Sequence, residues 1–395
     1  MTAVDPHAAT KPTRINAPIH QPVLKVLGLG GGGSNAVDRM IDLGLGGVDF
    51  IAANTDRQVL ERSKASVRIQ LGPKSTRGLG AGGNPEVGRA AAEESWREIA
   101  TALAGADMVF LTAGMGGGTG TGSIPVATQI AKKCGAVAIA VVTTPFSFEM
   151  GRRQKNASQG LEELRKHTNT LISIPNDRLL QIAPRDLPLD TAFRLADDVL
   201  RQAVQGITEL ITEPGLINVD FAHIRRLMKL GGGALMTIGQ AQGPDKAIKA
   251  VQQALNHPLL ENVSIHHAAG VIANFTAGTD LTLMDVSSAL SYLHDRANPD
   301  AEIVMGTTVD NRMEDRVQVI LVVTGLGASP LEEVLPGAEK AIQTPTKLPA
   351  SPHAENEILR IPQVVAPQVA TPHISTATNL DLPAFMRRQP RYAGR

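Results

Sequence analysis

The sequence predicts an α/β fold: a doubly wound parallel sheet joined by a long central helix to a second, α+β domain. Two observations predict the sheet. Short, almost continuously apolar runs alternate with helix-like segments, and glycine-rich loops lie between them. One long amphipathic segment, followed by a different alternation of elements, predicts the helix and the second domain.

Five short apolar runs are typical of strands that are buried on both faces of a parallel sheet. They span residues 24–29, 50–53, 108–112, 137–143 and 171–174. Helix-like segments lie between them at 35–43, with Ser34 as a candidate N-cap, and at 86–103 and 124–133. Strands that alternate with helices predict a parallel sheet over roughly residues 23–180.

Residues 190–213 predict one long helix, because apolar residues recur there at spacings of three and four. Pro214 and Gly215 would end it. Beyond this point the pattern changes to a mixture that predicts an α+β domain. Helix-like stretches span 224–228 and 245–255, and strand-like stretches span 263–268, 270–276, 301–308 and 317–325.

The two ends of the chain differ from its middle in composition. The first 22 residues lack the apolar core of a signal peptide and predict a disordered arm. Residues 329–378 hold eight of the 25 prolines and predict a flexible linker. An apolar cluster followed by arginines at 379–395 is typical of a docking peptide, a frayed end being the alternative. The predicted domains are 1–22, 23–189, 190–213, 214–328, 329–378 and 379–395.

The overall composition argues against several classes of protein. Lys and Arg number 38, as do Asp and Glu, so no net charge favours nucleic acid as a partner. No apolar run reaches the ~18 residues that a membrane span needs, so no direct membrane insertion is expected. The single cysteine, Cys134, fits a reducing cytoplasm and is expected to be a small buried residue rather than a nucleophile.

Two glycine-rich loops lie between a strand and a helix. The first runs from Gly28 to Asn35 and contains GxGxxG; the second, GMGGGTGTGS, spans 114–123. Both are expected at the carboxyl ends of parallel strands, on one edge of the sheet. Their backbone N–H groups and two helix N-termini would form a large anion site, which suits a di- or triphosphate. The lysine of a Walker P-loop is absent, and Thr119 and Thr121 would supply hydroxyl groups instead.

Two other interpretations of these loops stay open at this level. A GxGxxG loop is also typical of an NAD-dependent oxidoreductase, with Asp56 as the acid on the ribose, but this leaves the second loop unexplained. Alternatively, the glycines only permit tight turns between strand and helix. A third glycine stretch, 78–85, is expected near the same crevice, with Pro85 at the start of the next helix.

These motifs together resemble the FtsZ branch of the tubulin/FtsZ family, the bacterial cell-division GTPases. GGGTGTG at 116–122 is similar to the signature loop of that family. GGGGSNAVDRM, NTD at 54–56, GLGAGGNPEVGR, TTPFSFE, NDRLL and ITEPGLINVDFA are similar to its other motifs and occur in its order. The resemblance covers residues 24–327, and NLDLPAFMRRQ is similar to the C-terminal peptide of the family.

The resemblance implies a site for GTP or GDP with Mg²⁺, with no side chain assigned as a metal ligand. The first phosphate-binding loop is matched by Gly31, Gly32, Gly33 and Asn35, with Ser34 inside it, and the signature loop by Gly117, Gly118, Thr119, Gly120 and Thr121. A loop beside the nucleotide is matched by Asn54 and Asp56, and the loop that senses the γ-phosphate by Ala81, Gly82 and Gly83. Ribose and phosphate contacts are matched by Glu149 and Arg153. The residues that match the guanine and ribose pocket are Asn176, Phe193, Asp197 and Asp198.

The chemistry of the last group agrees with a guanine pocket. Phe193 offers a ring for stacking, and the Asp198 carboxylate can accept two N–H bonds from guanine, which adenine cannot supply. From the residues alone, Phe193 could equally be part of the core and Asp198 part of a solvated helix face.

The resemblance also implies that hydrolysis is completed between subunits, by acids that follow the long helix. The family motif is N-V-D-F-A-D, whereas this chain has Asn218, Asp220 and then His223 in place of the second acid. A neutral histidine can orient water or act as a base, but losing one positioned acid–base group costs on the order of 10²–10⁴ in rate. We hypothesise that binding and polymerisation are retained while turnover is slow. The alternatives are that Asp220 suffices, or that the protein is a non-hydrolysing scaffold.

The resemblance finally implies head-to-tail filaments of identical subunits that form the division ring. The location would be cytoplasmic, at mid-cell. The peptide 381–389, from Asp381 to Gln389, would dock membrane-anchoring or regulatory division proteins.

Overall fold

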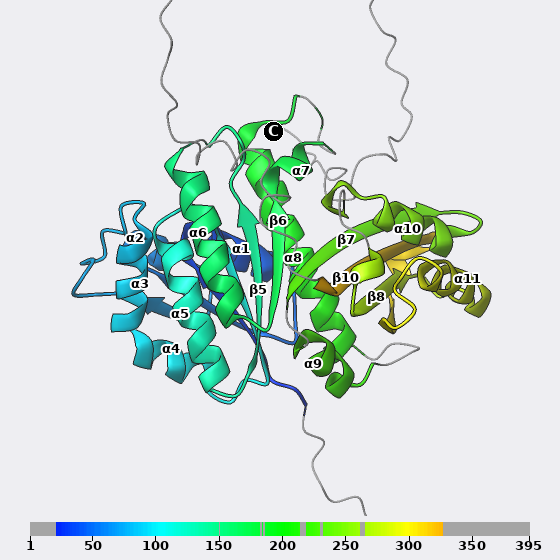
Figure 1. The fold of residues 1–395 in the computed structure, drawn as a ribbon, viewed down its shortest axis with the longest axis horizontal. Helices are drawn as coiled ribbons and strands as arrows, with labels where there is room; N and C mark the ends of the chain where they lie inside the picture. Colours follow the sequence, from blue (N-terminus) through cyan, green and yellow to red (C-terminus); the bar gives the residue numbers. More distant parts are fainter. Residues whose placement is uncertain are drawn as a thin grey trace, which may run out of the picture. The chain divides into compact units, whose positions relative to one another are not determined.

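The computed structural model describes residues 21–149, 151–181, 184, 186–213, 219–229, 232–260 and 265–326. Within these ranges lies one sheet of ten strands in the order β3-β2-β1-β4-β5-β6-β7-β10-β8-β9. Figure 1 shows the parallel strands with their helices and the second group of strands beyond β6. The predicted disordered arm, linker and docking peptide fall outside the described residues, apart from Gln21 and Pro22.

Six parallel strands form the first half of the sheet. They are β1 (Leu24–Leu29), β2 (Asp49–Asn54), β3 (Val67–Gln70), β4 (Met108–Gly114), β5 (Val137–Thr144) and β6 (Thr170–Pro175). Five of them are confirmed predictions, since strands such as β5, whose residues are all buried, must be apolar throughout. The edge strand β3 escaped prediction because only Ile69 of its four residues is buried.

The order of these strands reverses between β1 and β4. The chain passes from β1 outward to β2 and β3, and then returns to β4 on the other side of β1. A reversal of this kind leaves an opening at the carboxyl ends of the two central strands, where doubly wound sheets bind ligands. The two glycine loops that follow β1 and β4 therefore share one edge of the sheet, as predicted.

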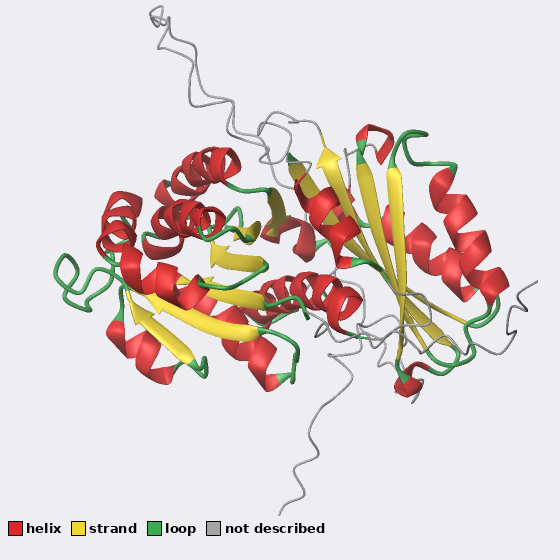
Figure 2. Ribbon diagram, turned by 90° about the horizontal axis from the view of Figure 1, so that it is seen from below, coloured by secondary structure: helices red, strands yellow, loops and turns green. Residues whose placement is uncertain are grey.

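Helices cover both faces of the parallel strands (Figures 1 and 2), with α3, α4, α5 and α6 on one face and α1 and α8 on the other. The helices of this half are α1 (Gly30–Asp42), α2 (Arg57–Arg62), α3 (Pro85–Glu94), α4 (Trp96–Leu103), α5 (Thr119–Lys133), α6 (Arg152–His167) and α7 (Asn176–Leu180). Pro85 is the first residue of α3, as predicted, and the Asn84 side chain caps it.

Three helix boundaries differ from the prediction. Helices α1 and α5 begin inside the glycine loops, so Ser34 lies within α1 and its prediction as an N-cap is wrong. The sequence did not predict these first turns because glycine has a low helix propensity. They form on glycines because the backbones pack closely: a Cβ on Gly33 would lie 2.4 Å from the Thr112 carbonyl oxygen. The single helix expected at 86–103 is broken at Ser95, whose hydroxyl accepts a hydrogen bond from the Gly72 amide.

The second half of the sheet begins after the central helix α8 (Leu189–Thr212). Its strands β7, β10 and β8 are antiparallel neighbours, β9 is parallel to β8, and β7 pairs in parallel with β6. The elements are α9 (Phe221–Lys229), β7 (Gly233–Gln242), α10 (Lys246–Leu255), η1 (Pro258–Leu260), η2 (Ile265–His267), β8 (Gly270–Ala277), α11 (Leu283–His294), β9 (Glu302–Val309), η3 (Asn311–Met313) and β10 (Arg316–Leu326).

This half confirms the predicted long helix and α+β domain. A hydrophobic core of its own, with Val251, Phe275 and Leu321, is separate from the core around Leu27, Ile99 and Leu111.

Two details of this half differ from the prediction. The strand expected at 263–268 is wrong for Ile265–His267, which form a 3₁₀ turn, and residues 261–264 lie outside the described part. Both β7 and α11 were not predicted. Across the described ranges, no helix is both long and apolar enough to cross a membrane.

The contact between α3 and α5 yields a prediction about stability. A Cβ on Gly122 would lie 1.9 Å from the Pro85 carbonyl oxygen, so Gly122→Ala must push the two helices apart. We expect a loss of about 1–3 kcal/mol in the free energy of unfolding, measured by urea denaturation. At Gly46, where a Cβ meets nothing within 4 Å, Gly46→Ala should not destabilise the protein. Equal effects of the two substitutions would contradict the close-packing account.

Candidate functional site

The first glycine loop lies backbone to backbone against the second. Gly30 has a φ of +70°, and a Cβ there would lie 2.7 Å from the Gly120 amide nitrogen. A Cβ on Gly32 would lie 3.1 Å from the Gly114 nitrogen. Glycine is thus required for the two loops to meet, and their meeting brings the N-termini of α1 and α5 together.

Gly31 and Gly117 are glycines that the protein's own packing does not require. Neither has a positive φ, and a Cβ at either position would meet no atom within 4 Å. Both lie where the strands end and the helices begin, with backbone N–H groups at helix N-termini. Because glycine has no side chain, it lets a phosphate approach the backbone closely. This explains a glycine at positions where the protein's own packing does not require one.

The second loop is held in shape by two threonines. The Gly116 amide donates to Thr121 Oγ1 at 2.8 Å, and Thr121 is only 2% exposed. Thr119 Oγ1 lies 2.6 Å from Thr55 Oγ1. Of the two hydroxyls predicted to face a ligand, that of Thr121 therefore supports the loop. Thr55, which the sequence analysis did not single out, ties the loop after β2 to the loop after β4.

The third glycine stretch lies against the second loop, as expected. The Gly80 amide donates to the Thr55 carbonyl at 3.2 Å. A Cβ on Gly118 would lie 2.7 Å from the Asn84 nitrogen and 2.9 Å from the Ala81 Cβ. Gly82 and Gly83 are exposed and both have positive φ. The three glycine loops therefore line one contiguous surface.

Asn54 and Asp56 organise the loop after β2. Asn54 is 3% exposed, and its Oδ1 accepts a hydrogen bond from the Asp56 amide at 3.1 Å. Asp56 Oδ1 accepts from the Gln58 amide at 2.9 Å and so caps α2. At least one oxygen of each side chain is thus used for local structure, and no ribose-binding role is needed to explain Asp56.

Glu149 and Arg153 form an ion pair at the edge of the second loop. Arg153 Nη1 lies 2.9 Å from Glu149 Oε2, and Glu149 Oε1 accepts from the Phe146 amide at 3.0 Å. A Cβ on Gly116 would lie 2.8 Å from the Arg153 carbonyl oxygen, so α6 is packed directly on the loop. The Arg153 side chain is 57% exposed despite this ion pair.

An aromatic cluster continues the site toward α8. The Phe193 and Phe146 rings meet edge to face, with centroids 5.4 Å apart, and Phe146 stacks on Phe148 at 5.0 Å. Phe193 is 39% exposed, so the alternative that it belongs to the core is wrong. Asn176 begins α7 and is buried, and its Oδ1 has no hydrogen-bond partner within the described ranges. Such an orphaned oxygen is costly unless a ligand supplies a donor.

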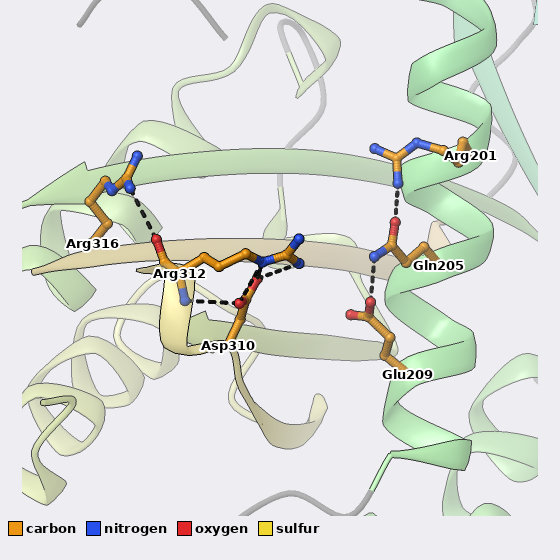
Figure 3. Close-up of polar contacts among 6 residues, drawn as sticks. All are labelled: Arg201, Gln205, Glu209, Asp310, Arg312 and Arg316. Atoms are coloured by element: carbon orange, nitrogen blue, oxygen red, sulfur yellow. Dashed lines mark hydrogen bonds and ion pairs between the residues drawn. The ribbon is translucent and has the colours of Figure 1, made fainter. Parts of the chain in front are cut away.

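Asp198 is already occupied by protein donors. It is 1% exposed and accepts hydrogen bonds from Arg201 Nε at 2.8 Å and Gln202 Nε2 at 2.7 Å. Figure 3 shows how the contacts continue along α8, from Arg201 to Gln205 and from Gln205 to Glu209. The alternative that Asp198 is a solvated residue is therefore wrong. Its engagement with Arg201 and Gln202 also argues against it as a base ligand.

Asp197 is the neighbouring carboxylate that stays available. It is partly buried, and burial raises its pKa to about 6, an effect that the positive charge of Arg39 opposes. Among the described residues, no hydrogen bond to this carboxylate is found. A desolvated carboxylate without a donor lacks compensation in the free protein. Of the two adjacent carboxylates, Asp197 rather than Asp198 is therefore the one left without a protein donor in the described part of the chain.

Asp220 and His223 lie far from the glycine loops of their own chain. Both are exposed, and Asp220 Oδ1 accepts from the Ala222 amide at 2.9 Å at the start of α9. The carbonyl of Met228 in α9 accepts a hydrogen bond from Thr170 Oγ1, and Thr170 is the first residue of β6. Asn176 follows Pro175, the last residue of the same strand. Six residues of strand span about 20 Å, so α9 lies at the opposite end of the sheet (Figure 1). Asn218 lies outside the described residues.

These features define an α/β protein of the nucleotide-binding class, with glycine loops and helix N-termini that converge where the strand order reverses. The Tubulin/FtsZ family GTPase domain matches residues 23–184, and the FtsZ family C-terminal domain matches residues 232–327. The chain therefore belongs to the tubulin/FtsZ family of GTPases, on its FtsZ branch. The NAD-dependent oxidoreductase interpretation is accordingly wrong.

Solved structures of other members agree with this assignment. An empty FtsZ dimer from M. jannaschii is 47% identical, with a TM-score of 0.74 over 78% of this chain and 89% of that chain. CetZ2 from Haloferax volcanii, a GTPγS-bound protofilament, is 20% identical, with a TM-score of 0.69 over 81% of this chain and 98% of that chain. The GDP-bound CetZ1 monomer from the same organism is 19% identical, with a TM-score of 0.69 over 81% of this chain and all of that chain. The two CetZ proteins share the fold.

The environment of Asp197 predicts a pH-dependent stability in the nucleotide-free protein. Its pKa of about 6 lies above the ordinary 3.8, so the folded state binds the proton more tightly than the unfolded state does. The stability that the proton provides is therefore lost as pH rises from about 4 to 6. We expect Asp197→Asn to raise the free energy of unfolding at pH 7.5, with the gain vanishing near pH 4, as measured by urea denaturation.

The adjacent Asp198→Asn is the matched control for this experiment. It removes the buried negative charge that pairs with the half-buried Arg201, so it should destabilise the protein at pH 7.5. If Asp197→Asn and the wild type are equally stable at pH 7.5, the account of a desolvated Asp197 carboxylate is wrong.

Proposed function

We propose that the protein binds GTP and GDP and polymerises head to tail, with GTP hydrolysis at the contact between subunits. The observation that carries this proposal is the position of its two sets of polar residues. The glycine loops lie at the carboxyl ends of the parallel strands, and Asp220 lies exposed at the opposite end. One chain cannot bring them together, whereas a head-to-tail neighbour can. Self-assembly of two relatives supports the proposal, since FtsZ from M. jannaschii forms a dimer and CetZ2 from Haloferax volcanii forms a protofilament.

In this proposal the phosphates lie on the open glycines. The N–H groups around Gly31 and Gly117, at the N-termini of α1 and α5, supply the positive potential that a P-loop lysine would otherwise provide. Mg²⁺ usually keeps several waters and binds through nucleotide phosphates with one or two protein oxygens. The Thr119 hydroxyl is a candidate oxygen.

Guanine would be recognised at the start of α8. The Asp197 carboxylate can accept two N–H bonds from guanine, which relieves its desolvation in the free protein. The exposed face of Phe193 can stack on the base, and the orphaned Asn176 oxygen can accept a further donor. This arrangement favours guanine over adenine, which lacks the two adjacent donors.

Hydrolysis would depend on α9 of the next subunit. Asp220 would orient the attacking water near the γ-phosphate, and His223 would replace a second acid. Arg225, Arg226 and Lys229 make the same helix basic, although Arg226 pairs with Glu302. We therefore propose slow turnover with binding and polymerisation retained. A non-hydrolysing scaffold is the alternative that His223 motivates.

At the level of the cell, we propose a cytoplasmic protein that forms the division ring at mid-cell. The segment 329–378 would act as a linker, and residues 381–389 would dock membrane-anchoring or regulatory division proteins. Both segments lie outside the described residues.

The slow-turnover proposal predicts that His223→Asp accelerates hydrolysis. Restoring the second acid should raise the rate of phosphate release by about tenfold or more, because one positioned acid–base group is worth on the order of 10²–10⁴. Phosphate release and light scattering would be measured in parallel with GTP, GDP and a slowly hydrolysed analogue. His294→Asp, a similarly exposed histidine on α11, is the control. A wild-type rate that already equals that of His223→Asp would contradict slow turnover, and GTP-dependent pelleting without phosphate release by either protein would indicate the scaffold.

The head-to-tail arrangement predicts that two inactive variants restore each other. Asp220→Ala keeps the nucleotide site, and Asp197→Ala keeps the α9 end, so a mixed contact would hold one intact copy of each. We expect the mixture to release phosphate several times faster than the sum of the two variants alone. A purely additive rate would contradict hydrolysis at a shared interface. Mixing Asp220→Ala with Asp220→Asn, which both lack the same end, is the control.

A further inference from the structure

Asn156 joins two of the glycine loops from a third element. It lies on α6 and is 9% exposed. Its Nδ2 donates to the carbonyl oxygen of Gly83 at 3.1 Å and to that of Gly116 at 3.2 Å. Gly83 belongs to the third glycine stretch and Gly116 to the second loop. One amide group therefore bridges two loops that are distant in sequence.

The chemistry of this bridge requires an amide. Both partners are carbonyl oxygens, so only the NH₂ end of the side chain can face them, and it has one proton for each. A serine hydroxyl has a single proton, and an aspartate would direct a negative charge at two acceptors. The identity of the residue is thus matched to its two partners.

The two loops differ in how firmly they are held. The second loop is packed on α6 at backbone level, because a Cβ on Gly116 would lie 2.8 Å from the Arg153 carbonyl oxygen. One turn beyond Asn156, a Cβ on Gly160 would lie 2.3 Å from Thr121 Cγ2. Gly82 and Gly83 are instead exposed, with φ of +57° and +69° and no atom within 4 Å of an added Cβ. Asn156 thus fastens an exposed loop to a fixed one.

We propose that Asn156 is a positioning residue that fixes the Gly82–Gly83 backbone relative to the phosphate loop. A loop that is already ordered pays less conformational entropy when it binds a ligand. The inference rests on the proposed GTP site and on the match of Ala81, Gly82 and Gly83 to the family's loop that senses the γ-phosphate. GTP should then depend on Asn156 more strongly than GDP, which lacks that phosphate.

The test compares the affinities of fluorescent GTP and GDP analogues for the full chain and for Asn156→Ala. We expect GTP affinity to fall by about tenfold and GDP affinity by less than threefold, since two hydrogen bonds and the order of one loop are lost. Hydrogen exchange of the Asn84 amide, which donates to the Ala81 carbonyl, should become faster. Asn156→Asp, of the same shape but without donors, should have at least as large an effect.

Asn169→Ala is the matched control, because Asn169 Oδ1 accepts from the Ala138 amide at the opposite end of the sheet. It loses a comparable hydrogen bond and should leave the GTP-to-GDP affinity ratio unchanged. The inference is overturned if Asn156→Ala leaves both that ratio and the exchange near Asn84 as in the wild type, or if Asn169→Ala changes the ratio equally. A wild-type protein that binds neither nucleotide overturns the proposed function instead. In that case unchanged exchange in Asn156→Ala would still refute the bridge by itself, and faster exchange would support it.

Discussion

Backbone-to-backbone contact between the loops after β1 and β4 is the constraint on which the rest of the site depends. Side chains at Gly30 and Gly33 would collide with the opposite backbone, because a Cβ there would lie 2.7 Å from the Gly120 nitrogen and 2.4 Å from the Thr112 carbonyl oxygen, respectively. Removing them lets two helix N-termini converge at the point where the strand order reverses. The positive potential of the site is then a property of oriented peptide groups. This explains how a chain without a Walker lysine can still form an anion site.

At the edges of the site, the polar side chains differ in whether they bind other groups of the protein. Several predicted site residues, such as Thr121 and Asp56, accept hydrogen bonds from backbone amides and so stabilise a loop or cap a helix. Others lack a protein hydrogen-bond partner in the described ranges, notably the Asn176 oxygen and the Asp197 carboxylate. Unpaired polar groups beside an exposed aromatic ring mark the part of the surface where a ligand would compensate for lost hydration.

The central helix α8 connects the two ends of the molecule. It carries Phe193 and Asp197 near its start and ends at Thr212, shortly before Asp220. Its 24 residues span about 36 Å, more than the about 20 Å of β6. A ladder of polar side chains runs along it: Asp198 accepts from Arg201, and the contacts continue from Arg201 to Gln205 and Glu209 (Figure 3). A rigid helix of this length keeps the glycine loops and Asp220 apart within one chain. In the proposed assembly, a neighbouring subunit would bring them together.

The sequence by itself determined the elements whose composition follows directly from burial. Strands covered on both faces are continuously apolar, so five of the six parallel strands, the long helix and the glycine loops were evident, as was the family through its motifs. Tertiary structure alone decided what depends on neighbours. The first turns of α1 and α5 form on glycines because another backbone packs against them. Asn156 donates hydrogen bonds to two loops that are remote from it in sequence, and only the fold brings them together. Asp197 and Asp198 are adjacent carboxylates about 100° apart around a helix. Only the packing of α8 on α1, where Arg39 Nε lies 3.8 Å from Asp198 Oδ1, determines which of the two is fully buried and which is left without a hydrogen-bond donor in the described ranges.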